Sequence, residues 1–160
     1  MGNDFICNTA LIQDKPTKVY QICKTKPGKD LKSLHKQIDK DFPPICREEK
    51  FNAIYCYSLQ ETVIDYPNGK SNVLYIGKTE GEVNDGKRKM SFRFKHCMSG
   101  KDGKINECLK FYYNTGTNLV LEIYALAGDK PCKEMETSLR NLFLQTYAAL
   151  PMADGASIKK

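Results

Sequence analysis

Two β-forming segments joined by a turn constrain the fold of this chain most strongly. Residues 53–59, Ala-Ile-Tyr-Cys-Tyr-Ser-Leu, are rich in aromatic and aliphatic side chains, and residues 73–77, Val-Leu-Tyr-Ile-Gly, have a similar composition. Between them, residues 67–70, Pro-Asn-Gly-Lys, form a typical turn sequence. The sequence therefore predicts two antiparallel strands with a long connection.

The residues after this strand pair predict a small α+β domain. Ser91 is a candidate N-cap for a short helix over residues 91–98, and apolar spacing from Ile105 to Tyr112 predicts a second helix. Residues 118–126 predict a third strand. Pro131 fits the first turn of a last helix, whose buried side carries Met135, Leu139, Leu142, Phe143 and Leu150. The order β-β-α-α-β-α predicts a small central antiparallel three-stranded sheet flanked by helices over residues 51–160.

Residues 1–50 predict a basic β/α extension packed on this domain. Residues 18–24 alternate in polarity like a strand. Behind Asp30 as a candidate N-cap, a helix is predicted by the spacing of Leu31, Leu34, Ile38 and Phe42. A chain of 160 residues and 18.2 kDa has the size of one compact domain. No stretch approaches the length of a membrane span, so no membrane partner is expected.

The cysteines predict a reduced protein rather than a zinc site. The seven cysteines include no Cys-x-x-Cys pair, and only two histidines accompany them. Scattered thiols of this kind are typical of a reducing compartment, which predicts an intracellular, cytoplasmic protein.

The strand pair also carries a motif that resembles the GIY-YIG nuclease family. The specific segment is Tyr-Ile-Gly-Lys-Thr at residues 75–79, preceded by Ala-Ile-Tyr at residues 53–55. The family's order of elements covers residues from about 53 to 154. Ala53 stands where the family has glycine, and nineteen residues separate Tyr55 from Tyr75.

This resemblance implies a metal-dependent DNA endonuclease that hydrolyses phosphodiester bonds. It implies that Tyr55 and Tyr75 place phenols at the centre of the sheet, one acting as or through a general base, with Lys78 supplying positive charge. Arg93 would hold the scissile phosphate through two parallel hydrogen bonds. His96 would accept a proton or bind the phosphate. It follows Arg93 by three residues rather than the family's four, but both spacings share a helix face.

A glutamate on the last helix is implied to hold one Mg²⁺ or Mn²⁺ ion per active site. Glu134 shares its helical stripe with polar residues, whereas Glu136 shares one with Leu139 and Phe143 at the edge of the apolar face. The stripe predicts that Glu136 is the partly buried carboxylate. One carboxylate together with bound waters suits Mg²⁺, so Glu136 is the predicted metal ligand.

Each of these residues also has an ordinary structural interpretation. The tyrosines can be half-buried strand residues, Arg93 and Lys95 a solvated helix face, and Glu136 the partner of Arg140 four residues on. The ordered set favours the nuclease over these alternatives.

The size of the chain resembles a compact restriction enzyme, and cleavage of both strands would then require a homodimer on double-stranded DNA. The alternatives are a nucleic-acid-binding module of the same fold that has lost turnover, and a structure-specific nuclease for branched DNA in repair or recombination.

The net charge of +6 divides into two basic segments on an acidic remainder. Residues 87–110 carry eight Lys and Arg against two acids, and residues 15–36 carry seven against one. Both segments are predicted to contact the DNA backbone. The predicted contact residues are Lys87, Arg88, Lys89, Lys95, Lys101 and Lys104 in the first segment, and Lys24, Lys26 and Lys29 in the second.

Overall fold

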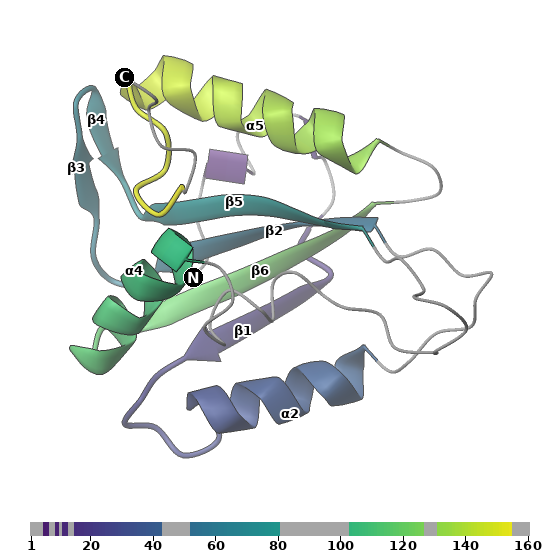
Figure 1. The fold of residues 1–160 in the computed structure, drawn as a ribbon, viewed down its shortest axis with the longest axis vertical. Coiled ribbons are helices and arrows are strands. Elements are labelled where there is room, and N and C mark those ends of the chain that lie inside the picture. The colour runs from purple at the N-terminus through teal and green to yellow at the C-terminus, as the bar shows by residue number, and fades with distance from the viewer. Residues whose placement is uncertain are drawn as a thin grey trace.

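The computed structural model describes residues 5–6, 9, 11–12, 15–42, 52–80, 103–126 and 131–154. Its fold is α+β, with a four-stranded antiparallel sheet, a separate two-stranded hairpin and flanking helices (Figure 1). In chain order the elements are β1 (Lys18–Ile22), α2 (Leu31–Asp41), β2 (Asn52–Leu59), β3 (Ile64–Tyr66), β4 (Gly69–Ser71), β5 (Val73–Glu80), α4 (Gly103–Asn114), β6 (Leu119–Leu126) and α5 (Cys132–Tyr147). None of the described helices is long and apolar enough to cross a membrane.

The central sheet has the strand order β1-β6-β2-β5, and each neighbouring pair is antiparallel. Strand β2 therefore has a partner on both sides, with Tyr55 opposite Gly77 of β5 and opposite Ile123 of β6. The three strands predicted from the sequence are confirmed. The long connection between β2 and β5 contains the hairpin β3–β4, which turns at the predicted Pro-Asn-Gly-Lys segment.

The prediction of a three-stranded sheet is wrong by one strand. The N-terminal segment predicted to lie in a packed extension forms β1, which pairs with β6 from Lys18 opposite Ile123 to Ile22 opposite Leu119. Strand β6 therefore has a partner on both sides, β2 on one and β1 on the other. Tyr20 and Ile22 bury their side chains on one face of β1 and extend the core.

Side chains of the sheet alternate between two hydrophobic cores, as the two-residue period of a strand requires. Tyr55 and Tyr57 belong to the core that includes buried residues of α2 and α4. Ile54 and Cys56 belong to the core that includes buried residues of α5. Figure 1 shows the corresponding layers, with α5 over one face of the sheet and α2 beneath the other.

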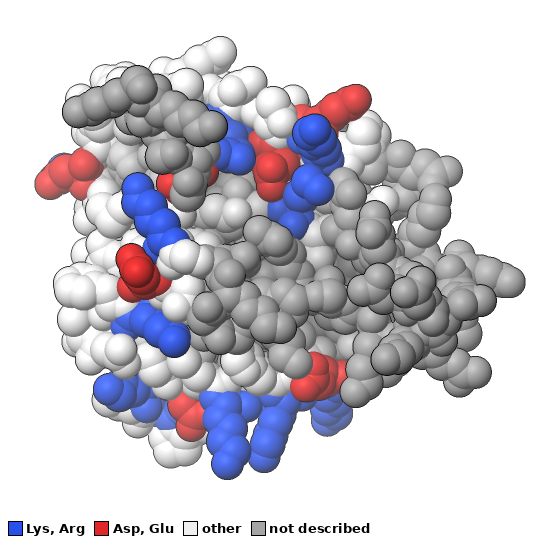
Figure 2. All heavy atoms as spheres, viewed as in Figure 1, with Lys and Arg blue, Asp and Glu red and all other residues white. Residues whose placement is uncertain are grey.

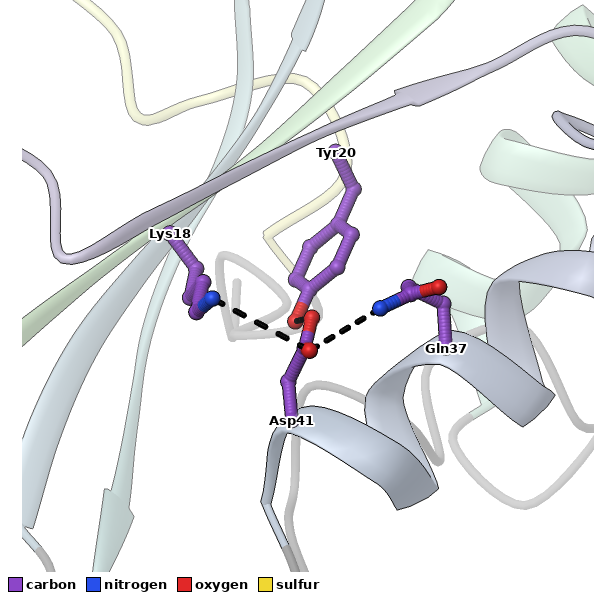
Figure 3. Close-up of polar contacts among 4 residues, drawn as sticks. All are labelled: Lys18, Tyr20, Gln37 and Asp41. Atoms are coloured by element: carbon purple, nitrogen blue, oxygen red, sulfur yellow. Dashed lines mark hydrogen bonds and ion pairs between the residues drawn. The ribbon is translucent and has the colours of Figure 1, made fainter.

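Helix α2 begins and ends close to its predicted bounds and is fixed to β1 by polar contacts. Asp30 is its N-cap, and the carboxylate accepts a hydrogen bond of 2.8 Å from the backbone N–H of Ser33. At the other end, Asp41 accepts 2.8 Å from the hydroxyl of Tyr20 and 2.9 Å from the amide of Gln37, as Figure 3 shows. The hydrogen bond from Tyr20 is the main cause that lowers the pKa of the Asp41 carboxyl.

The last helix differs from its prediction at both ends. Pro131 is the N-cap of α5 rather than a residue of its first turn. The helix ends at Tyr147 because Ala148 adopts a left-handed conformation with φ 57°, so Leu150 lies beyond it. The other predicted apolar residues of α5 do line the core. The helix predicted over residues 91–98 lies outside the described residues.

Candidate active site

Tyr55 and Tyr75 form an aromatic pair across strands β2 and β5. Their ring centroids are 5.8 Å apart with an interplanar angle of 38°. The ring of Tyr57 meets that of Tyr55 edge-on at 6.1 Å. Tyr55 is completely buried, whereas Tyr75 is only partly buried against the same core. Of the two phenols, that of Tyr75 is therefore the more accessible.

Gly77 allows this pair to form because it has no side chain. A Cβ at this position would lie 2.5 Å from Cζ and 2.6 Å from the hydroxyl oxygen of Tyr55, and 2.6 Å from Cε1 of Tyr75. These separations are below any real Cβ contact, so both rings occupy the space that a side chain would fill. The glycine of the Tyr-Ile-Gly segment is thus explained by the close approach of the two tyrosines.

Lys78 lies on the opposite face of β5 from Tyr75, which corrects the role predicted for it. Strand residues three apart face opposite ways, and the neighbouring Ile76 packs in the core of α5. The positive charge of Lys78 instead acts on the carboxyl of Glu136, whose pKa it lowers. Lys78 therefore belongs with the glutamate rather than with the phenols.

Glu136 is the partly buried glutamate of α5, as its helical stripe predicts. Its side chain is 16% exposed, whereas Glu134 is an exposed residue. Its carboxylate lies 3.7 Å from the guanidinium of Arg140 and accepts a hydrogen bond from the backbone N–H of Lys78. Burial raises the pKa of the Glu136 carboxyl above its ordinary value, although Arg140 and Lys78 both act to lower it.

Arg140 also binds Asp154, a residue that the sequence analysis does not single out. The guanidinium donates to one carboxylate oxygen of Asp154 at 2.6 Å and lies 2.5 Å from the other. The Asp154 side chain is only 5% exposed. Asp154 also acts to raise the pKa of Glu136, so the two carboxylates are close enough to interact. Glu136, Arg140 and Asp154 therefore form one charged cluster.

The charged cluster borders the outer side of β5, which is the last strand of the described sheet. Ala153 donates its backbone N–H to the carbonyl of Leu74 at 2.9 Å, and Glu136 accepts from the N–H of Lys78. These contacts satisfy backbone groups that an edge strand would otherwise expose. The tyrosine pair and the charged cluster thus reach β5 from different faces and do not belong to one core.

The other predicted site residues are distributed as follows. Lys104 is exposed in the first turn of α4, and Lys24, Lys26 and Lys29 lie in the loop between β1 and α2. Seven of the predicted residues lie outside the described ranges, and their roles stay predictions: Lys87, Arg88, Lys89, Arg93, Lys95, His96 and Lys101.

The described residues offer no site for a metal that needs three or more protein ligands. Within the described residues there is no group of three or more His, Cys, Asp or Glu side chains placed to hold a metal ion. Mg²⁺ is usually bound by one or two carboxylates and keeps several waters. Glu136 and Asp154 are two carboxylates close to one another, and both contact the guanidinium of Arg140.

Comparison of the chain with protein-family models, curated proteins and solved structures finds no match.

Proposed function

We propose that this chain is a metal-dependent DNA endonuclease that hydrolyses phosphodiester bonds at strand β5. The observation that carries the proposal is the close packing of the Tyr55 and Tyr75 rings against Gly77. Gly77 brings the two rings closer than any side chain at that position would allow. The partly buried carboxylate of Glu136, at the outer side of the same strand, is the second support.

In this proposal the tyrosine pair handles the proton of the attacking water. In its ionised form, the phenolate of Tyr75 would accept that proton as the water oxygen bonds to phosphorus, the bond to the leaving oxygen breaks and the leaving oxygen takes a proton from solvent. Tyr55 holds the Tyr75 ring in place through their contact, and its own burial limits its movement. An ordinary phenol has a pKa near 10, so at neutral pH the step depends on positive charge nearby.

The charged cluster holds the metal ion in this proposal. Glu136 and Asp154 are the ligands, and a bound Mg²⁺ would neutralise charge on the phosphate. Arg140 orients both carboxylates through its contacts of 3.7 Å and 2.6 Å. Because the tyrosine pair and the charged cluster lie on opposite faces of β5, the proposal requires the scissile phosphate to contact both from the edge of that strand.

Cleavage of supercoiled plasmid tests the proposal, with Glu136→Gln as the critical variant. Glutamine keeps an acceptor for the N–H of Lys78 but removes the charge. Glu134→Gln is the matched control, because Glu134 is an exposed glutamate on the same helix. We expect nicking or linearisation in Mg²⁺ or Mn²⁺, no cleavage in EDTA, and a loss of about 100-fold in Glu136→Gln alone.

The proposal fails if the wild-type chain cuts no DNA in either metal, or if the two glutamine variants cut equally. The ratio of nicked to linear product also reports the number of active sites. One site cuts one strand, so rapid linearisation would support a restriction-type homodimer. Faster cutting of branched than of linear DNA would instead support a structure-specific nuclease.

The second candidate is a nucleic-acid-binding module of the same fold without turnover. It is favoured by the contacts of Glu136 with Arg140 and with the N–H of Lys78, which give this residue a structural role. Salt-dependent DNA binding without cleavage in any divalent metal would support this candidate.

A further inference from the structure

We infer that helix α2 and the loop before it form a surface that binds the phosphate backbone of duplex DNA. This basic face consists of Lys24, Lys26, Lys29, Lys32, Lys36 and Lys40. The inference rests on the proposed function for the identity of the polyanion as DNA. It adds a second contact surface, in which α2 takes part, at the far edge of the sheet from the candidate active site.

The lysines of α2 lie on one side of the helix, away from the core. Lys32, Lys36 and Lys40 recur every four residues and are exposed, whereas Leu34 and Ile38 are buried. In Figure 2 basic side chains gather along the lower edge of the molecule, where α2 lies in Figure 1. None of these three lysines forms an ion pair with another residue in the part of the chain that the structure describes. Lys32 interacts electrostatically with Asp30 and Lys40 with Asp41, so these charges are partly balanced, and a polyanion would add a further partner on the exposed side.

Six lysines against three acids leave this region with a net positive charge, the acids being Asp30, Asp39 and Asp41. Asp30 caps α2 through the N–H of Ser33. Asp41 accepts hydrogen bonds from Tyr20 and Gln37, and Lys18 lies 3.9 Å away (Figure 3). These contacts join α2 to β1, which gives the lysines a rigid base.

An open cleft of about 360 Å³ lies between β1 and α2 beside the basic face. Lys29 and Gly28 line it, together with the amide side chains of Gln21 and Gln37. The Lys29 ammonium donates a hydrogen bond to Gln21, so it is held at the wall of the cleft. Val19, Tyr20 and Leu34 also line the cleft, so it has a mixed polar and apolar lining beside which a sugar-phosphate backbone can approach Lys29.

The packing of α2 favours nucleic acid over a membrane as the partner. A helix that binds a bilayer presents an exposed apolar side to it, but the apolar side of α2 is in the protein core.

The dimensions of the basic face also suit DNA. From Lys32 to Lys40 the row of lysines on α2 is about 12 Å long, close to the width of the major groove of B-DNA. The edge strands β1 and β5 are about 14 Å apart at the usual strand spacing.

The experiment measures binding of a fluorescein-labelled DNA duplex by anisotropy, in EDTA so that no cleavage occurs. The test variant is Lys32→Gln with Lys36→Gln. The control variant is Lys70→Gln with Lys133→Gln, which removes the same charge from exposed positions on β4 and α5. Two lost phosphate contacts lower the salt slope by about 1.8. Raising the salt concentration from about 50 to 200 mM weakens DNA binding in both proteins. The weakening should be about 12-fold smaller for the test variant than for the wild type.

Equal salt slopes in the test and control variants would overturn the inference. It would also be overturned if the chain bound phosphatidylserine vesicles more tightly than DNA and only vesicle binding depended on Lys32 and Lys36. Plasmid cleavage is scored separately with Glu136→Gln. Salt-dependent binding through Lys32 and Lys36 without cleavage would support the basic face while rejecting the nuclease, and cleavage with equal slopes would do the reverse.

Discussion

Replacing Gly77 with alanine tests whether the tyrosine pair depends on the absent side chain. The new Cβ would lie 2.5 Å from Cζ of Tyr55, and an ordinary van der Waals contact begins at 3.4 Å, so the ring must retreat by about 0.9 Å. It has no space to do so, because Tyr55 is fully buried and its ring contacts those of Tyr57 and Tyr75. Overpacking of this kind costs about 1–3 kcal/mol.

Urea and thermal unfolding measure this cost. In a chain of this size the loss corresponds to a fall in Tm of about 2–12 °C. Gly103→Ala is the matched control, because Gly103 begins α4 and a Cβ there would meet nothing within 4 Å. We expect that control to change the free energy of unfolding by less than about 0.5 kcal/mol. The same two variants in the plasmid assay should differ in cleavage, since only Gly77→Ala displaces the phenols.

A double-mutant cycle identifies the tyrosine rings as the cause. In a Tyr75→Ala background the Tyr55 ring can move into the vacated space, so Gly77→Ala should cost less there than in the wild type. The coupling energy should exceed about 0.5 kcal/mol. The reasoning is refuted if Gly77→Ala is as stable as Gly103→Ala, or if its cost is the same with and without the Tyr75 ring.

Two further predictions concern the charged cluster. Because burial raises the pKa of Glu136, the folded chain binds that proton more tightly than the unfolded chain, and stability falls as pH rises from 4.5 through the raised pKa. Glu136→Gln should remove this fall in urea titrations from pH 4 to 8, and parallel curves would contradict it. Arg140→Gln removes the guanidinium from the buried Asp154, with a loss toward the lower end of about 3–5 kcal/mol because Arg140 is 24% exposed. Adding Asp154→Asn should restore part of that loss, and an unchanged urea midpoint in Arg140→Gln would count against the ion pair.

Local sequence patterns predict the elements of this fold but not all of their partners. The strand at residues 18–22 follows from alternation, and α2 follows from apolar spacing behind Asp30. That β1 would join the sheet beside β6 depends on contacts about 100 residues apart, which no local pattern records. The hairpin β3–β4 has strands of three residues each, too short for a periodic signal.

The candidate site, too, could be predicted from the sequence only in part. Helical spacing alone distinguishes the buried Glu136 from the exposed Glu134. The face of Lys78 also follows from the sequence, since strand residues three apart point opposite ways, and the role predicted beside Tyr75 overlooks this rule. Asp154 could not be found, because its contact with Arg140 depends on the reversal of the chain after Ala148.

The charge of Glu136 is the point at which the structural and catalytic interpretations separate. A residue that only protects the edge of β5 needs an acceptor for the N–H of Lys78, and a neutral glutamine provides one without the cost of burying a charge. The chain instead has a carboxylate there, with a second acid, Asp154, on the same arginine. Arg140 and Lys78 do not offset the burial, because the pKa of Glu136 is still raised. The ion pair with Arg140 gives the charge a structural role, and a divalent cation would stabilise it further, so a Mg²⁺-dependent rise in Tm that is lost in Glu136→Gln separates the two interpretations.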